Sequence, residues 1–239
     1  MNTNFRVRLD QLNNYVHAKL YGNRLVSTWI TNQFHKLYYS NHRRTWRHNT
    51  HWFGIPLLKM PTDLWVYQEL VYELQPDAII ECGTFDGGSA LYFAHLCDLL
   101  GKGRVLSIDI DPHENLPDHP RITYLTASST APETIEQVQS FTANSQQTLI
   151  ILDSDHTMAH VLDELRLYQQ FVKPGGYIIV EDGNVNGRPV MPFFGPGPYE
   201  AVQRFLKETE QFMVDKDREK FYLTSNPSGY LRRVNKQSA

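Results

Sequence analysis

Short apolar runs alternate with amphipathic stretches from about residue 60 onward. The runs are predicted to be strands at 78–82, 104–109, 122–125, 148–152 and 177–181, and those at 78–82, 148–152 and 177–181 are predicted to be buried. Stretches with helical spacing lie between them, at 61–74, 90–100, 132–141 and 158–172. Strands that alternate with helices pair in parallel through right-handed crossovers. The pattern therefore predicts an α/β fold with a mostly parallel sheet.

The pattern changes after residue 181. A stretch rich in glycine and proline, 187–198, precedes a predicted helix that ends near residue 210. Two short apolar runs at 221–224 and 230–234 then flank a turn that contains Asn, Pro and Gly. Such a pair predicts a hairpin, so we expect an antiparallel C-terminal strand.

The first 60 residues differ from the rest and are predicted to form a helical segment that serves as a lid or in oligomerisation. One helix face carries Leu9, Leu12, Val16 and Leu20. A basic and aromatic stretch follows at 42–48, which we interpret as solvated or partner-facing. Nucleic-acid binding is not expected, because the net charge of the chain is -3. The second predicted domain covers residues 61–239.

Composition is ordinary for a globular protein, with 41% hydrophobic and 21% charged residues among 239. The 2 cysteines, Cys82 and Cys97, are too few for a disulfide framework. No apolar run is long enough to span a membrane. The N-terminal residues also lack the apolar core of a signal peptide. A cytoplasmic protein without membrane contact is expected.

Acidic residues follow two successive predicted strands. Glu181 and Asp182 end the run at 177–180, and the sequence Asp153-Ser154-Asp155-His156 follows the run at 148–152. Carboxylates at neighbouring strand tips converge and repel one another unless a cation lies between them. Because Mg²⁺ prefers a few carboxylates and some water, the pattern predicts a magnesium site. In an open α/β sheet, ligands bind at this edge.

Two acids compete for one place in this predicted metal site. Asp153 and Asp155 point to the same side of an extended chain. Asp153 is the first residue after the strand, and from the residues alone both acids remain candidates. If Asp153 is the ligand, Asp155 is solvated, indirectly bound, or a cap for the helix that begins near Thr157.

A glycine-rich turn follows the first strand of the α/β pattern. It contains Glu81, Gly83, Thr84 and Ser89, and leads into a helix whose free N–H groups face the turn. The G-x-G-x-x-G spacing of dinucleotide sites is missing, and an acid precedes the first glycine. This favours a ligand with an ammonium group. The second strand ends in Asp109, which is placed to accept ribose hydroxyls, so a nucleoside ligand is predicted.

Several motifs together carry a resemblance to a known family. They are E-x-G-T-x-x-G-x-S at 81–89, K-P-G-G at 173–176, W-F-G at 52–54, K-M-P-T-D at 59–63, D-S-D-H-T at 153–157 and N-P-S-G-Y-L at 226–231. Between residues 52 and 233 the chain resembles the cephalosporin hydroxylase-like family, which includes rhamnosyl O-methyltransferases. The resemblance implies a Rossmann-like class I methyltransferase fold and S-adenosylmethionine as cofactor. It also implies that Glu81, Gly83, Ser89 and Asp109 line the cofactor pocket, with Ser128 near the adenine.

The arrangement of the acids in the predicted metal site resembles that of catechol O-methyltransferase, and this pattern favours Asp153 over Asp155 as the ligand that follows the fourth strand. The lysine that serves as base there has no evident counterpart, because Met158 lies near its place. His156 and His160 are four residues apart and are candidates for the general base. Arg188 and the stretch 191–197 are interpreted as a lid over the acceptor.

The sequence therefore predicts a Mg²⁺-dependent O-methyltransferase that acts on a hydroxyl of a sugar or secondary metabolite. A hydroxylase or other oxidoreductase is the first alternative, in which His156 and His160 serve an iron site. A non-catalytic partner subunit is the second. The expected partner is a small hydroxylated acceptor, and a homo-oligomer is predicted from the aromatic N-terminal segment.

Overall fold

A seven-stranded sheet forms the centre of the protein. The computed structural model describes residues 3–41 and 49–234, so the basic stretch 42–48 lies outside the described residues. The sheet order is β5-β4-β3-β6-β7-β9-β8. The strands are β3 (Ala78–Cys82), β4 (Arg104–Asp109), β5 (Ile122–Thr126), β6 (Thr148–Leu152), β7 (Tyr177–Val180), β8 (Phe212–Val214) and β9 (Tyr230–Arg233). Pairing is parallel except at β9, which runs antiparallel to β7 and β8. The predicted fold class is confirmed.

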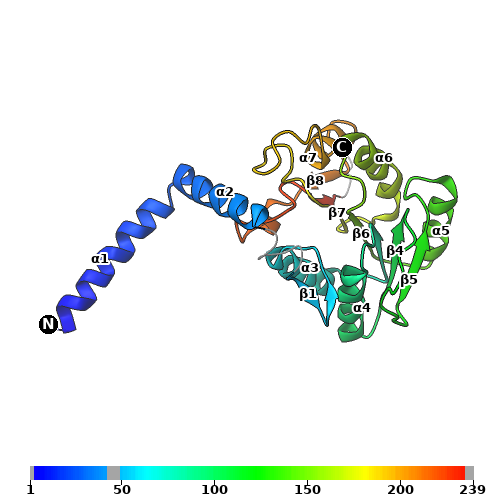
Figure 1. Cartoon of the computed structure of the whole chain (residues 1–239), viewed down its shortest axis with the longest axis horizontal. Helices are drawn as coiled ribbons and strands as arrows, with labels where there is room; N and C mark the ends of the chain where they lie inside the picture. Colours follow the sequence, from blue (N-terminus) through cyan, green and yellow to red (C-terminus); the bar gives the residue numbers. More distant parts are fainter. Residues whose placement is uncertain (1–2, 42–48, 235–239) are drawn as a thin grey trace.

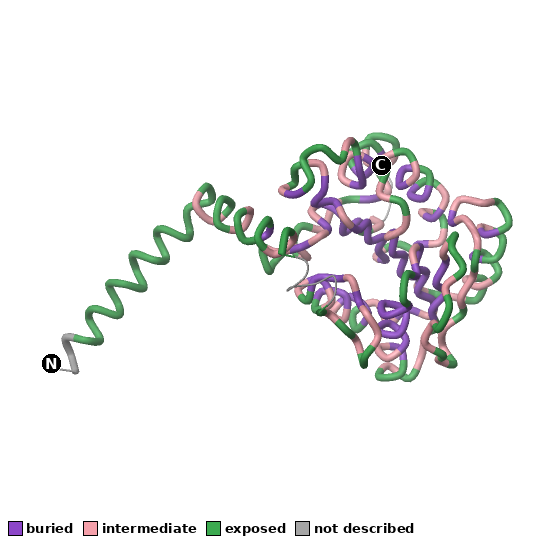
Figure 2. The backbone as a smooth tube through the Cα atoms, in the orientation of Figure 1, coloured by how far each residue is buried: buried purple, intermediate pink, exposed green. Residues whose placement is uncertain are grey.

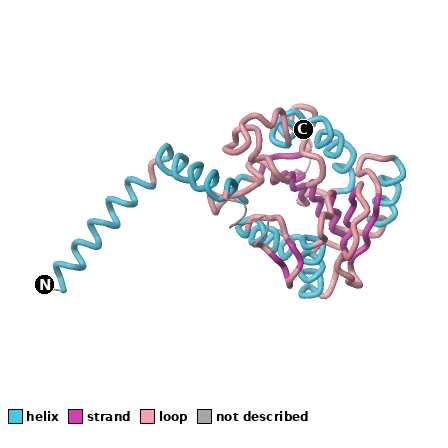
Figure 3. Tube along the Cα trace, viewed as in Figure 1, coloured by secondary structure: helices cyan, strands magenta, loops and turns pink. Residues whose placement is uncertain are grey.

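Helices cover both faces of this sheet (Figures 1 and 3). They are α3 (Pro61–Leu74), α4 (Gly88–Leu100), α5 (Pro132–Thr142), α6 (Met158–Tyr168) and α7 (Pro198–Phe205). Alternate strand residues point to opposite faces. Ile79, Leu149 and Ile179 therefore pack with α3 and α4. Ile80, Ile150 and Ile178 pack with α5, α6 and α7 on the other face. Burial on both faces explains why these strands are continuous apolar runs.

The tail of the sheet differs from the predicted hairpin. The strand prediction at 221–224 is wrong, because β8 at Phe212–Val214 pairs with β9 instead. Residues 221–224 form a loop that passes over a buried acid. There the hydroxyl of Thr224 donates to Oδ1 of Asp63 at 2.5 Å, and the backbone N–H of Ser225 donates to its Oδ2 at 2.8 Å. A polar contact that the apolar pattern does not show therefore decides the path of the chain.

Two helices precede the α/β core. α1 (Thr3–Tyr21) projects away from the body, and every side chain from Arg6 to Tyr21 is exposed (Figures 1 and 2). α2 (Arg24–Ser40) is capped by Asn23, whose side chain accepts from the N–H groups of Leu25 and Val26. The short strands β1 (His51–Trp52) and β2 (Ile55–Pro56) then pair with each other. β1 packs against α4, where the ring of Trp52 meets that of Tyr92.

In the part of the chain that the structure describes, no helix combines the length and apolar character needed to cross a membrane. The cytoplasmic location stays a prediction.

Candidate functional site

A cavity of about 910 Å³ opens at the carboxyl ends of β3, β4, β6 and β7. Ten of the twelve residues proposed from the sequence line it: Gly83, Thr84, Ser89, Asp109, Ser128, Asp153, Asp155, His156, His160 and Asp182. The remaining two, Glu81 and Glu181, are buried and are not among the lining residues. The predicted cofactor and metal residues thus meet in one cavity, with two carboxylates beneath its surface.

The turn after β3 is shaped by a close approach between two strands. Gly83 has φ +101°, and a Cβ built on it would lie 2.0 Å from the backbone oxygen of Asp153. Only glycine fits this position, because it adopts positive φ without strain and has no side chain. The glycine therefore allows the cofactor loop and the acidic tip of β6 to lie against each other.

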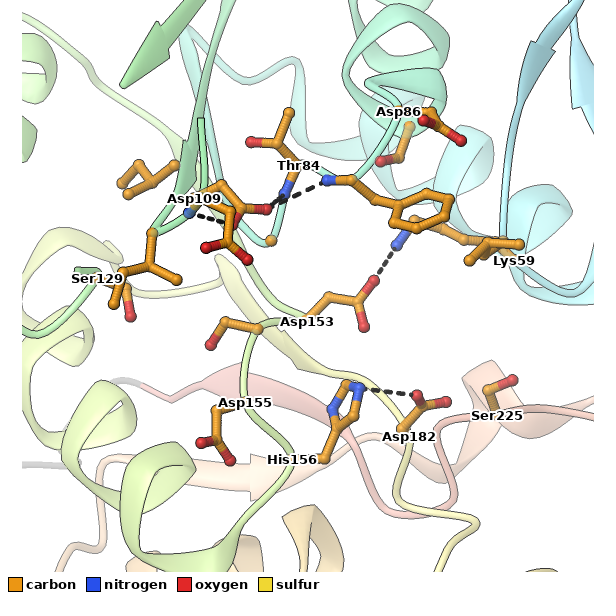
Figure 4. A pocket seen from close by; sticks show the side chains of 18 of the residues that line it. Lys59, Thr84, Asp86, Asp109, Ser129, Asp153, Asp155, His156, Asp182 and Ser225 are labelled. Carbon is orange, nitrogen blue, oxygen red and sulfur yellow. Dashed lines mark hydrogen bonds and ion pairs between the residues drawn. The ribbon is translucent and has the colours of Figure 1, made fainter. Parts of the chain in front are cut away.

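Asp109, at the end of β4, organises the glycine-rich loop. Its Oδ2 accepts from the backbone N–H groups of Thr84 at 2.7 Å and Phe85 at 3.2 Å, and its Oδ1 accepts from the N–H of Asp111 at 3.0 Å (Figure 4). These backbone hydrogen bonds hold the pKa of Asp109 below its usual value, although burial opposes them. The carboxylate is thus ionised and fixed at the cavity wall.

Glu81 lies under the same loop within a chain of hydroxyl groups. Its Oε2 accepts from Oγ of Ser107 at 2.9 Å, and that hydroxyl is 2.8 Å from Oγ1 of Thr84. Its other oxygen, Oε1, has no hydrogen-bond partner among the described residues. Since buried carboxylate oxygens normally find a donor, a cationic group at this position would satisfy an unmet demand.

The metal candidates converge opposite the cofactor loop (Figure 4). Asp153, His156 and Asp182 each offer one ligand atom, and these atoms lie within 4.8 Å of one another. Asp182 has φ +53°, an uncommon conformation for an aspartate. Its Oδ2 is 3.2 Å from Nε2 of His156. The two carboxylates suit a hard divalent cation, and the imidazole of His156 lies beside them.

Glu181 is held differently from its neighbour Asp182. Its Oε1 accepts from Nζ of Lys59 at 2.6 Å, and the same ammonium donates to Oδ2 of Asp153 at 2.8 Å. Burial lowers the pKa of Lys59, but the charges of Asp153 and Glu181 outweigh this effect and raise it well above its usual value. The structure thus places a buried ammonium between two predicted metal ligands.

Sequence reasoning missed Lys59 as a site residue. The lysine follows the apolar residues Ile55 to Leu58 and precedes Met60, so it interrupts a run that is otherwise apolar. A single charge in such a run is a signal for a buried ion pair. Its partners lie 94 and 122 positions away, so pattern reading alone does not reveal them.

Asp155 faces the start of α6. Its Oδ1 accepts from the backbone N–H of Thr157 at 2.7 Å, and this hydrogen bond lowers the pKa of the carboxyl. The N-cap of α6 is Thr157, which has no side-chain cap hydrogen bond, so Asp155 closes a turn before the helix instead of capping it as predicted.

His160, the second base candidate, belongs to a polar cluster on the β5 side of the cavity. Its Nε2 is 3.3 Å from Oε1 of the fully buried Glu164 and 3.2 Å from Oγ of Ser129. The contact with Glu164 raises the pKa of His160. Hydroxyls of Ser129 and Ser154 donate to the same carboxylate oxygen, at 2.5 and 2.7 Å. His160 therefore contacts Glu164 and Ser129, and it does not belong to the group of Asp153, His156 and Asp182.

The predicted lid lies beside the end of α2. Met191 and Phe194 line the cavity together with Tyr39, whose hydroxyl is 3.0 Å from the sulfur of Met191. Arg188 is not a lining residue; it pairs with Glu200 at 3.0 Å and stacks on the ring of Tyr199. The N-terminal segment and the loop after β7 thus form one wall of the cavity.

The sheet order, with a single antiparallel strand and a cavity at the parallel strand ends, defines a class I methyltransferase. A family model described as "Rhamnosyl O-methyltransferase/CmcI" matches residues 44–234. The chain belongs to this family. Its enzyme class is therefore that of an S-adenosylmethionine-dependent O-methyltransferase, as predicted.

Relatives and solved structures agree with this placement. Rhamnosyl O-methyltransferase of Mycobacterium tuberculosis is 41% identical over 213 residues, which cover 85% of each chain. The protein of the same name from Mycobacterium leprae is also 41% identical, over 85% of this chain and 90% of its own. Among solved structures, "CmcI-N160 apo-structure" has a TM-score of 0.61 and 23% identity, covering 78% of this chain and 76% of the other. A second, "cmcI-D160 Mg-SAM", has a TM-score of 0.56 and 22% identity, covering 78% and 77%. These two structures share the fold.

Proposed function

We propose that the protein transfers a methyl group from S-adenosylmethionine to a hydroxyl of a sugar or secondary metabolite, with Mg²⁺ as a second cofactor. The observation that carries this proposal is the shared cavity. It places the glycine-rich loop with Asp109 opposite the group of Asp153, His156 and Asp182. The rhamnosyl acceptor in the names of the relatives supports a sugar, and the magnesium named for one structural neighbour supports the metal.

The cofactor half of the cavity fits a nucleoside that carries an ammonium group. Asp109 is placed to accept hydrogen bonds from ribose hydroxyls, while Ser128 lines the side assigned to the adenine. The carboxylate of Glu81 lies beneath this half of the cavity and adds negative charge on the side where the ammonium of the methionine part would bind. Gly83, Thr84 and Ser89 would form the wall along which the cofactor lies.

The metal half fits a hard dication. Asp153 and Asp182 would hold this cation. Glu181 follows β7 directly before Asp182, and its carboxylate accepts from Lys59. The bound methyl donor would supply an electrophilic carbon, and the bound cation would supply positive charge beside the acceptor hydroxyl. The protein's own part is to hold the hydroxyl in line and to exclude water.

His156 is the residue best placed to receive the acceptor proton. A nitrogen of its ring lies within 4.8 Å of carboxylate oxygens of Asp153 and Asp182, and its contact with Asp182 orients the ring. His160 instead is tied to Glu164 and Ser129. We therefore assign proton removal to His156 and cofactor-side packing to His160.

We also propose that the chain divides at residue 60 into an N-terminal segment and a methyltransferase domain, with one refinement. Tyr39 and the residues from Pro56 to Met60 line the cavity, so the first 60 residues contribute a wall as well as a projection. The wall and the loop at 191–197 would close over the acceptor.

We further propose that α1 binds a second copy of the chain. An isolated helix of this length is marginally stable in water, yet Leu9, Leu12, Val16 and Leu20 are 44–60% exposed. Residues 1–50 contain eight of the 23 basic residues and one of the 26 acidic ones. Their charge is thus +7, against -10 for residues 51–239. The basic first 50 residues of one copy complement the acidic remainder of another.

Light scattering tests this association. Replacing both Leu12 and Val16 with Glu should reduce the measured mass to that of one chain. Asn14→Glu, on the opposite face of α1, should leave the mass unchanged. A single-chain mass for the unaltered protein contradicts the proposal.

The function itself is tested by titrating the protein with S-adenosylmethionine, with Mg²⁺ and with chelator, followed by assays on rhamnosides and other hydroxylated acceptors. Methylated product that requires Mg²⁺ supports the proposal. Cofactor binding without any Mg²⁺ effect removes the metal from it. A product that gains oxygen instead of a methyl group would reverse the assignment to an oxidoreductase.

A further inference from the structure

Lys59 is a charged side chain that the proposed reaction does not use. It precedes α3 and lines the cavity, and its side chain is 3% exposed. It donates at 2.8 Å to Asp153 and at 2.6 Å to Glu181. These two acids end neighbouring strands, β6 and β7. The ammonium therefore lies at the point where the two strand tips meet.

The charges around this point are unbalanced without the lysine. Glu81, Asp153 and Glu181 each act on Lys59 electrostatically, and Asp182 follows directly in the chain. Buried carboxylates that face each other repel strongly unless a cation compensates them. Lys59 is the cation that the chain itself supplies.

The lysine binds one oxygen of Asp153 and one oxygen of Glu181. Each carboxylate has two oxygens, so a second oxygen of each remains for other contacts. Asp153 belongs to both groups: it pairs with Lys59 and is one of the three metal candidates. A cation bound by Asp153 and Asp182 thus shares a carboxylate with the ammonium and is repelled by it.

We propose that Lys59 is a tethered counter-ion of the metal centre, which positions Asp153 and Glu181 and weakens the binding of the divalent ion. When the metal is absent, the ammonium compensates the two acids and keeps them in place. When the metal ion is present, the positive charge of the ammonium repels it, so the ion is bound reversibly. This inference rests on the proposed metal site, and it makes Lys59 a positioning residue.

Mn²⁺ binding to the cofactor-free protein tests the inference, measured by calorimetry and by the electron paramagnetic resonance of free Mn²⁺. Lys59→Met keeps the length of the side chain and removes its charge. Because the repulsion between ammonium and dication is lost, the dissociation constant of Mn²⁺ should fall by about tenfold or more. Lys59→Arg keeps the charge and should leave the constant unchanged.

The double variant K59M/E181Q separates charge from packing. It removes one positive and one negative charge, so Mn²⁺ affinity should return to that of the unaltered protein. A K59M variant with unchanged or weaker Mn²⁺ binding overturns the proposal, since a lysine that serves only packing has no reason to oppose the metal. If K59M tightens binding and the double variant binds as tightly, the effect is not one of charge and the proposal also fails.

Removal of Lys59 leaves buried acids without compensation, and the K59M variant is therefore expected to unfold at lower temperature. If it does not fold, the unaltered protein decides. In the NMR spectrum of ¹⁵N-lysine-labelled protein, K59R identifies the ammonium signal of Lys59 by its loss. Saturating Mg²⁺ should shift that signal, and an unmoved signal overturns the proposal.

Failure of the proposed function gives a different result. If neither Mn²⁺ nor Mg²⁺ binds the unaltered protein, the metal centre itself is refuted. If the ions bind and only the response of the Lys59 variants is missing, the metal centre stands and the counter-ion role is refuted.

Discussion

The side-chain amide nitrogen of Asn184 lies 3.0 Å from Nε2 of His35 and ties helix α2 to the loop after β7. Both residues are buried. Because the amide donates, the ring nitrogen must accept, and only a neutral imidazole has a free acceptor nitrogen. Burial also lowers the pKa of His35 to about 4. The wall of the cavity therefore depends on an uncharged histidine.

The attachment of α2 should weaken in acid. The pKa of His35 is about 4 in the folded protein and 6.5 as the ordinary value. Between these values the unfolded state binds more protons, so stability falls as the pH drops from 6.5 to 4. The shift corresponds to about 3 kcal/mol. Hydrogen exchange of α2, followed from pH 7 to pH 4, should show progressively weaker protection.

His35→Gln is the control for this pH effect. Glutamine can accept from Asn184 and does not titrate, so the difference in stability between the two proteins should shrink or reverse as the pH falls. Parallel pH profiles for both proteins would show that another group is responsible.

The metal assignment predicts unequal effects for two neighbouring acids. Asp182→Asn should weaken Mn²⁺ binding by about tenfold or more, because a charged ligand is lost. Asp155→Asn should not change Mn²⁺ binding, since Asp155 accepts from the N–H of Thr157. Calorimetry with each variant measures this, and S-adenosylmethionine affinity serves as the check on folding. Equal losses in both variants would contradict the assignment.

The role of His156 predicts a separation between rate and binding. His156→Asn should lower kcat by about 100-fold or more, the usual range for loss of a general base. Mn²⁺ affinity should stay as it was. A joint loss of rate and Mn²⁺ affinity would instead identify His156 as a metal ligand. His160→Asn is the matched variant, and it should alter the KM for S-adenosylmethionine more than kcat.

Gly83 should tolerate no side chain. Gly83→Ala brings a Cβ to 2.0 Å from a backbone oxygen of Asp153, so the cofactor loop and β6 must separate. Gly101 also has a positive φ, +72°, but a Cβ there meets no atom within 4 Å. Gly101→Ala should therefore lower the free energy of unfolding by only about 1–2 kcal/mol, through backbone strain. Urea unfolding compares the two. A Gly83→Ala protein as stable as Gly101→Ala would show that the strands separate without loss.

Much of the fold could be predicted because burial produces a regular pattern. The central parallel strands β3, β6 and β7 are buried along their whole length, and glycine or acidic residues mark where they end. The strand β8 was missed because Phe212–Val214 is only three residues long and half exposed. The strand expected at 221–224 was wrong because Thr224 is used by Asp63, a contact between residues 161 positions apart.

The candidate site shows the same limit. Residues that follow a strand, such as Asp109 and Asp153, are brought together by the sheet, and their position follows from the order of strands. Lys59 enters from outside this repeat, so its place between two acids depends on how β1, β2 and α3 pack. Sequence position also does not separate Glu181 from Asp182, although the backbone turn at Asp182 directs the two carboxylates to different partners.

The antiparallel strand β9 has a consequence for synthesis. It follows every other strand in the chain, yet it lies between β7 and β8. The N–H of Val180 pairs with Gly229, and the N–H of Asp182 pairs with the side chain of Asn226. While the ribosome is still making residues 226–233, β7 is therefore an unpaired sheet edge, open to strands of other nascent chains. Pairing of β9 then covers this edge of β7, and the accompanying contact from Asn226 fixes the backbone at Asp182.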